Sequence, residues 1–200
     1  MKSLIQACSI TLIICSLLTF GHLSVQAQTA QEPVLLTSCG QSPGPVRLKV
    51  FMQRLKIDFE YNALATAADL AAKKKEDKPY KSVIIVTGAS LKGMGAAGVS
   101  VDDELARTKA LIEEARKQGI TVIGSHIEGM ARRSQGASSG DNSDELSIDA
   151  VCPNSDFMIV KQEGDSDKRF TNISTSKKIP LLLFDLNKEM LDLLKKVYNK

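Results

Sequence analysis

Residues 82–87 have the sequence SVIIVT, an unbroken run rich in β-branched side chains. A run of this kind is typical of a strand that is buried on both faces, which occurs in parallel sheets covered by helices on each side. Because parallel strands are joined only through crossover connections, the segments between such runs are expected to contain helices. This run constrains the possible fold more strongly than any other feature of the chain.

Apolar runs and amphipathic stretches alternate along most of the chain. Their order predicts an α/β fold with three layers and a doubly wound, mostly parallel sheet of five or six strands. A Rossmann-like and a flavodoxin-like strand order both fit. Strands are expected at 33–38, 57–61, 82–87, 120–123, 157–161 and 179–184, and helices at 43–56, 65–76, 144–151, 169–178 and 187–198. One more helix is expected between a capping box at Ser100 and Asp103 and a stop at Gly119, after a glycine-rich loop at 88–99.

The N-terminus has the organisation of an export signal. Lys2 is the only charged residue before Glu32, residues 4–20 are mostly apolar, and Ala27 ends a short stretch that suits a signal peptidase. We predict that residues 1–27 are a signal peptide cleaved after Ala27, and that the protein is periplasmic or secreted with no membrane span remaining. An uncleaved signal anchor is the alternative. Residues 28–200 are then expected to form a single α/β domain, with a flexible loop at 133–143.

The charge balance argues against one class of partner. The chain of 200 residues has 26 Lys and Arg against 23 Asp and Glu, which gives a formal charge of +3. Such a balance produces no strong field over the whole molecule, so nucleic acid is not an expected partner.

Small and polar residues gather after three of the expected strands. In open α/β sheets a ligand binds outside the carboxyl ends of the strands, at the point where the strand order reverses. Glycines there allow close approach of the backbone, helix N-termini offer N–H groups, and arginine suits a carboxylate or a phosphate. These loops therefore predict a site for a small, anionic molecule. The expected contacts are Ser38, Gly40, Gln41, Ser42, Gly88, Ser90, Lys92, Gly93, Gly95, Ser125, His126, Glu128 and Arg132.

Cys39 and His126 form a candidate catalytic pair. Cys39 precedes an expected helix start, where a thiolate is favoured, and His126 could serve as its base. Cys39 could instead be a packed residue at a strand end, or form a disulfide with Cys152 in an oxidising compartment. His126 could equally be a loop residue that bonds to the backbone.

The sequence gives little support for a metal or a dinucleotide. No His, Cys, Asp and Glu cluster has metal-ligand spacing, so no metal is expected. Residues 93–98, GMGAAG, match the pattern G-x-G-x-x-G, but the match begins six residues beyond Thr87 instead of directly after the strand. The pattern is therefore a weak indication of a dinucleotide, and the cofactor is left open.

Three stretches carry a resemblance to a family. They are TSCGQSPG from Thr37, TGASLKGMGAAGVSVDDELAR from Thr87 and IGSHIEGMARR from Ile123. They resemble the small exported bacterial and archaeal proteins of domain-of-unknown-function family 6305, and the family-like core covers residues 33–186. The resemblance implies a three-layer α/β fold and export, and it assigns no activity and no catalytic residue.

These observations lead to three functional hypotheses. The first is an exported protein that binds a small, anionic molecule at the carboxyl-end loops of the sheet. The second is a hydrolase or thiol enzyme that depends on Cys39. The third is a non-catalytic module that interacts with an envelope partner. The oligomeric state is left open.

Overall fold

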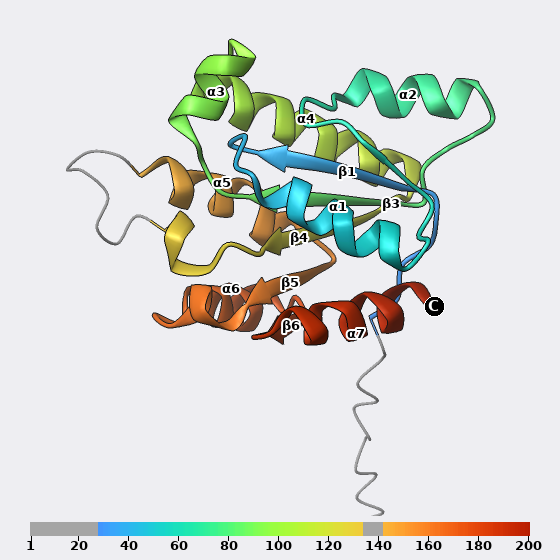
Figure 1. The fold of residues 1–200 in the computed structure, drawn as a ribbon. Helices are drawn as coiled ribbons and strands as arrows, with labels where there is room; N and C mark the ends of the chain where they lie inside the picture. The colour runs from blue at the N-terminus through green and yellow to red at the C-terminus, as the bar shows by residue number, and fades with distance from the viewer. Residues whose placement is uncertain (1–27, 134–141) are drawn as a thin grey trace, which may run out of the picture.

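The computed structural model describes residues 28–133 and 142–200. At its centre is a six-stranded sheet with the order β2-β1-β3-β4-β5-β6, in which all neighbouring strands run parallel (Figure 1). This confirms the predicted α/β fold and selects the flavodoxin-like order at the β1–β3 switch point. The strands are β1 (Val34–Cys39), β2 (Phe59–Tyr61), β3 (Ser82–Thr87), β4 (Thr121–His126), β5 (Phe157–Lys161) and β6 (Leu181–Phe184).

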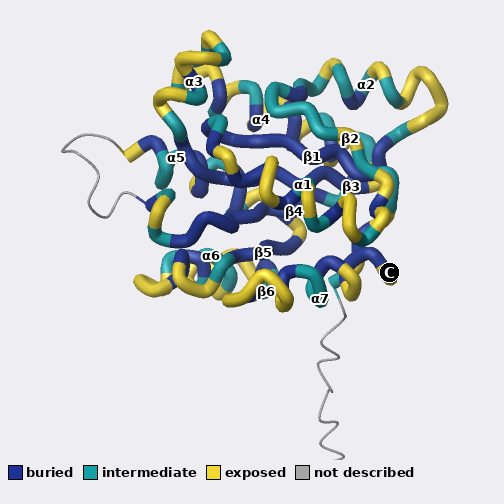
Figure 2. Tube along the Cα trace, viewed as in Figure 1, coloured by how far each residue is buried: buried dark blue, intermediate teal, exposed yellow. Residues whose placement is uncertain are grey.

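Helices cover both faces of the sheet. Side chains alternate along β1, so Leu36 belongs to the core beneath α1 and α7, whereas Leu35 belongs to the core beneath α2 and α4. A third cluster around Phe170 lies beneath α5 and α6. Figure 2 shows the four inner strands β1, β3, β4 and β5 largely buried, whereas the edge strands β2 and β6 and the outer sides of the helices are more exposed. The helices are α1 (Gly44–Arg54), α2 (Ala67–Lys75), α4 (Val101–Gln118), α5 (Ser143–Val151), α6 (Arg169–Lys177) and α7 (Asn187–Tyr198).

The segment between β3 and α4 differs from the prediction. In place of a loop it holds a short helix, α3 (Leu91–Ala97). The Ser90 hydroxyl accepts a hydrogen bond from the Gly93 N–H at 3.0 Å at its start, and Gly98 ends it with a φ of +69°. Glycine is a poor helix former, so the composition predicted a loop, but end caps stabilise short helices against that preference.

Two element boundaries also change what lies at the carboxyl ends of the strands. α1 begins at Gly44 with Pro43 as its N-cap, so Ser42 lies outside the helix and is not its cap residue. β4 continues to His126 because Gly124 and the residues after it pair with β5. The capping box at the start of α4 is confirmed, with the Ser100 hydroxyl accepting from the Asp103 N–H at 3.1 Å.

Other predictions concern residues at or beyond the limits of the described ranges. The predicted signal peptide, residues 1–27, and most of the predicted loop at 133–143 lie outside the described residues. Arg133, at the start of that loop prediction, is not a loop residue in solvent: it is buried and donates to Glu145 at 2.6 Å and to Asp167 at 2.7 Å. Within the described ranges, no helix is both long and apolar enough to cross a membrane.

Candidate functional site

The switch point between β1 and β3 is closed by contacts between its own two loops. Gln41 and Ala89 form an isolated antiparallel bridge, and the Ser90 N–H donates to the Gly40 carbonyl at 2.7 Å. The cavity left beside this bridge has a volume of about 10 Å³, which is the space of a single water molecule. The loops thus meet as the strand order predicts, but they fill the crevice in which a ligand of this fold would normally lie.

Backbone N–H groups at this edge are already bonded to carboxylates of the protein. An anionic ligand would need free donors of this kind, as at other helix N-termini and glycine loops. The bonds are from Gly40 N to Glu104 Oε2 at 2.8 Å, from Gly44 N to Glu128 Oε2 at 3.1 Å and from Ala89 N to Asp144 Oδ1 at 2.5 Å. The N–H groups that were predicted to bind an anion therefore already donate to carboxylates of the protein itself.

Glu104 and Arg107 on α4 hold the loop after β1 in place, and sequence reasoning missed both. Glu104 is buried and also accepts from the Gln41 side-chain amide at 3.0 Å. Arg107 forms an ion pair with Glu104 at 2.9 Å and donates to the Ser38 carbonyl at 2.6 Å and the Ala65 carbonyl at 2.7 Å. A charged pair at this spacing, on the helix face that carries the apolar residues, is a signal that could have revealed them.

Four predicted contact residues do come together on the other side of the β3 loop. Gly88 has a φ of +135°, and a Cβ there would lie 3.2 Å from the Ser42 hydroxyl and 3.3 Å from Cβ of Arg132. Arg132 donates to the Ala89 carbonyl at 2.8 Å and lies 3.6 Å from a Glu128 oxygen. Glycine at position 88 is therefore required both by the backbone conformation and by the close packing of Ser42 and Arg132.

The geometry around Cys39 does not favour a catalytic nucleophile, and the catalytic assignment stays an untested prediction. Cys39 is the last residue of β1, it is fully buried beneath α4, and burial raises the pKa of its thiol to about 11. A buried neutral thiol is a poor nucleophile, since the thiolate is the reactive form. Cys152 is also buried, and both thiols are free, so the disulfide alternative is not realised.

The surroundings of His126 likewise do not favour a base or a ligand contact, and that assignment also stays a prediction. Its Nε2 donates to the Gly129 carbonyl at 3.0 Å, and its Nδ1 lies 3.1 Å from the Thr87 hydroxyl. Burial lowers the pKa of the ring, which favours the neutral form. His126 ends β4 and Cys39 ends β1, and β3 lies between these two strands. The backbones of β1 and β4 are therefore roughly 10 Å apart, which is two strand spacings. Both ring nitrogens of His126 thus have partners inside the protein, and this arrangement agrees with the alternative interpretation of a histidine that bonds to the backbone.

The remaining predicted contacts do not converge on one cavity. The Ser38 hydroxyl accepts from the Gln41 N–H at 2.9 Å, and the Ser125 hydroxyl donates to a carbonyl of β5 at 3.1 Å. Lys92 is exposed on α3, and an added Cβ at Gly95 would meet nothing within 4 Å. These residues were grouped because they follow strands in sequence, and their side chains diverge in the fold.

A pocket that the sequence did not predict lies at the same edge of the sheet, between α1 and α7. Its volume is about 410 Å³, within the range of small-molecule sites. Its apolar lining consists of Val50, Phe51, Ile127, Phe184 and Met190. Its polar lining consists of Arg47, Lys161, Asp185 and Asn187. We call this cavity the α1–α7 pocket. It opens where β4, β5 and β6 end, and this placement follows the general rule for the fold.

The charges in the α1–α7 pocket differ in whether they are already paired. Lys161 forms an ion pair with Glu163 at 2.5 Å. Among the residues that the structure describes, the side chains of Arg47 and Asp185 have no hydrogen-bond or ion-pair partner. The exposed position of Arg47 in the first turns of α1 gave no sequence signal, because the other pocket residues come from distant parts of the chain.

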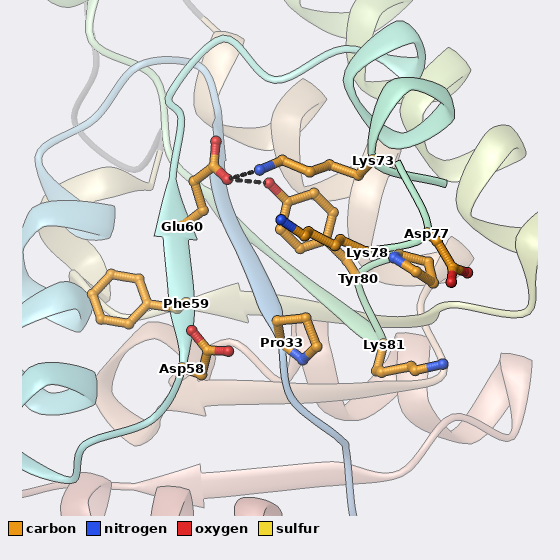
Figure 3. Close-up of a pocket in the computed structure, with 10 residues that line it drawn as sticks. Pro33, Asp58, Phe59, Glu60, Lys73, Asp77, Lys78, Tyr80 and Lys81 are labelled. Atoms are coloured by element: carbon orange, nitrogen blue, oxygen red, sulfur yellow. Dashed lines mark hydrogen bonds and ion pairs between the residues drawn. The ribbon is translucent and has the colours of Figure 1, made fainter. Parts of the chain in front are cut away.

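A second hollow lies at the opposite, amino-terminal edge of the sheet. It has a volume of about 740 Å³ and lies between β2 and the segment that leads into β3 (Figure 3). Glu60 closes one end, accepting a hydrogen bond from Tyr80 at 2.6 Å and pairing with Lys73 at 2.8 Å. These contacts lower the pKa of Glu60, with the bond from Lys73 as the largest cause. Because ligands in this fold bind at the carboxyl edge, we do not place the functional site here.

The described part of the chain contains no candidate metal site. Across residues 28–133 and 142–200, no group of three or more His, Cys, Asp or Glu side chains is arranged to hold an ion. Nothing in those residues suggests which cofactor, if any, the protein takes.

Comparison with known protein families gives one match that spans the domain. Residues 31–198 match the model described as Domain of unknown function (DUF6305). The chain belongs to this family. The match covers all six strands and α1 to α7, so DUF6305 corresponds to the whole folded domain. A search of curated proteins finds no match.

Solved structures with a similar arrangement come from different enzyme classes. They include esterase EstA from Pseudoalteromonas sp., at 11% identity and a TM-score of 0.36, covering 83% of this chain and 96% of that chain. A GDSL-like lipase from Bacteroides thetaiotaomicron has 16% identity and a TM-score of 0.34, with coverage of 82% and 84%. A GDP-L-fucose synthetase from Naegleria fowleri has 12% identity and a TM-score of 0.38, with coverage of 81% and 52%. None of these likenesses assigns a role to a residue of this chain.

Proposed function

We propose that this DUF6305 protein is an exported binding protein that takes a small molecule with an anionic group and an apolar body in the α1–α7 pocket. One observation carries the proposal: an apolar cavity of about 410 Å³ opens at the carboxyl edge beside Arg47, whose guanidinium has no partner among the described residues. Ligand sites are mostly apolar cavities with a few polar groups that fix orientation. A guanidinium fork matches a carboxylate or a phosphate.

The proposal keeps the predicted ligand class and edge of the sheet, and changes the contact residues. The amides near the switch point are bonded to Glu104, Glu128 and Asp144, which leaves them unavailable to an anion. The predicted contacts include two cations: Lys92 is exposed on α3, and Arg132 is already engaged with the Ala89 carbonyl. Arg47 is therefore the better candidate for the anion contact.

Two arginines at the same edge give a matched test. Isothermal titration calorimetry of residues 28–200 would measure binding of 4-methylpentanoate, benzoate and inorganic phosphate to the wild type, Arg47→Ala and Arg132→Ala. Losing a charge-assisted hydrogen bond costs about 1.5–3 kcal/mol, or roughly a ten- to hundredfold loss of affinity. We expect that loss in Arg47→Ala only. Equal affinities in the wild type and Arg47→Ala, or a loss confined to Arg132→Ala, would reject the α1–α7 pocket as the site.

The interaction-module hypothesis is supported by a different observation. Val46 and Val50 on α1 are 51% and 59% exposed, and Leu186 at the start of α7 is 62% exposed. Val46 and Leu186 are outside the lining of the α1–α7 pocket, whereas Val50 is part of it, and this apolar surface could contact an envelope partner. Sedimentation of residues 28–200 with and without a soluble envelope fraction, using Val46→Ser as the variant, would test that role. The thiol-enzyme hypothesis is not proposed again, because Cys39 and His126 are buried and apart.

A further inference from the structure

We infer that the ligand of the α1–α7 pocket is a zwitterion, namely an α-amino acid with an apolar side chain. This inference rests on the proposed function and names the chemistry of its ligand. The feature that points to it is the pair of Arg47 and Asp185, two charges of opposite sign that line one pocket without bonding to each other.

The other charges around the pocket are already committed. Glu163 neutralises Lys161 at 2.5 Å. The Glu189 carboxylate accepts a hydrogen bond from the backbone N–H of Asp185 at 2.7 Å, so this N–H before α7 is not available to a ligand. Among the described residues this leaves the guanidinium of Arg47 and the carboxylate of Asp185 as the charges available to a ligand.

The two available charges come from opposite walls. Arg47 belongs to α1, whereas Asp185 lies in the turn between β6 and α7. A purely anionic ligand would bring a like charge toward Asp185, and a neutral apolar ligand would desolvate both charges without compensation. A ligand with a carboxylate for Arg47 and an ammonium for Asp185 satisfies both groups.

The apolar lining sets the third requirement. Ile127, Phe184 and Met190 are at most 7% exposed, and together with Phe51 they form an apolar surface inside the pocket. A branched aliphatic or aromatic side chain would gain by burial there, at about 25 cal/mol per Å² of apolar area removed from water. The class that combines all three features is an amino acid such as leucine or phenylalanine.

Three ligands that share one apolar body separate the contributions. Leucine carries both charges, 4-methylpentanoate lacks the ammonium, and 3-methylbutylamine lacks the carboxylate. Calorimetry on residues 28–200 is expected to show leucine binding at least tenfold more tightly than either analogue. Asp185→Asn is expected to weaken leucine at least tenfold and to leave 4-methylpentanoate unchanged or tighter. Asp58→Asn, an acidic position in the groove at the amino edge, is the control and should change neither.

The outcomes separate the inference from the proposed function. If 4-methylpentanoate binds as tightly as leucine, or Asp185→Asn leaves leucine unaffected, the zwitterion is wrong while an anion site at Arg47 stands. If leucine and the anions all fail to bind the wild type, both are wrong. Loss of leucine in Asp185→Asn with 4-methylpentanoate retained supports both.

Discussion

Replacing Gly93 by alanine tests whether the G-x-G-x-x-G match reflects packing or a ligand. A Cβ at position 93 would fall well inside van der Waals contact of the Gln41 backbone carbonyl and 3.2 Å from Cβ of Ser90. Gln41 cannot move away freely, because its side chain is bonded to the Ala63 carbonyl at 3.0 Å and to Glu104 at 3.0 Å. The glycine is therefore explained by the approach of α3 to the loop after β1.

The neighbouring Gly95 supplies the matched control. It lies in the same helix, and an added Cβ there meets nothing within 4 Å. Alanine in a helix is favoured over glycine by about 1 kcal/mol, so Gly95→Ala should raise the free energy of unfolding by roughly 0.5–1 kcal/mol. Gly93→Ala has the same gain but incurs overpacking of about 1–3 kcal/mol or more, so its net effect is a loss of roughly 1–2 kcal/mol.

Thermal unfolding of residues 28–200 without any ligand measures this difference directly. A gap of about 1.5–3 kcal/mol between the two variants corresponds to a difference in Tm of roughly 3–12 °C for a domain of this size. If Gly93→Ala is as stable as Gly95→Ala, the packing explanation fails. The glycine at position 93 would then need a reason outside the fold itself, such as the approach of a ligand.

Three further predictions concern buried groups. The pKa of His126 is lowered in the folded state, so the unfolded chain binds its proton more readily. Stability is therefore full well above about pH 6.5 and falls as the pH drops below that value, by up to about 1.4 kcal/mol per pH unit, and His126→Asn should flatten this slope in urea titrations. Cys39 and Cys152 should resist alkylation at pH 8 until the domain unfolds, because burial raises the pKa of both thiols; rapid labelling of the native protein would contradict this. Glu104→Ala should cost about 3–5 kcal/mol in chemical denaturation, because it leaves the Arg107 side chain, which is only 11% exposed, without its carboxylate, whereas a loss below 1 kcal/mol would refute that role.

The local assignments that succeeded rest on short-range chemistry. The strand at Phe157–Lys161 and the helix at Asn187–Tyr198 begin and end where the sequence pattern places them, because a buried strand and an amphipathic helix each leave a periodic signal. The capping box at Ser100 succeeded for the same reason, since all of its partners lie within four residues.

Cys39 and His126 lack support in the structure for one common reason. Cys39 and His126 follow the pattern of reactive residues at strand ends, yet each is the last residue of its strand and points into the core beneath the helices. Whether a side chain at a strand end points into the core or toward the edge depends on a register of one residue. The sequence placed the end of β4 three residues too early, and that error turned a buried histidine into an apparent loop residue.

The sequence by itself determined the fold class, because buried strands that alternate with helices leave only doubly wound arrangements. Its placement of a ligand at the carboxyl edge of the sheet stays a prediction that follows from the fold class. Tertiary structure decided which polar groups at that edge already have a hydrogen-bond or ion-pair partner within the protein and which do not. Glu104, Glu128 and Asp144 reach the loop amides from sites up to 84 residues away in sequence. Arg47 and Asp185 are 138 positions apart by number and share a pocket only because α1 and α7 pack on the same face of the sheet. Pairings over such separations follow from the packing of helices on the sheet, and no local pattern of residues encodes them.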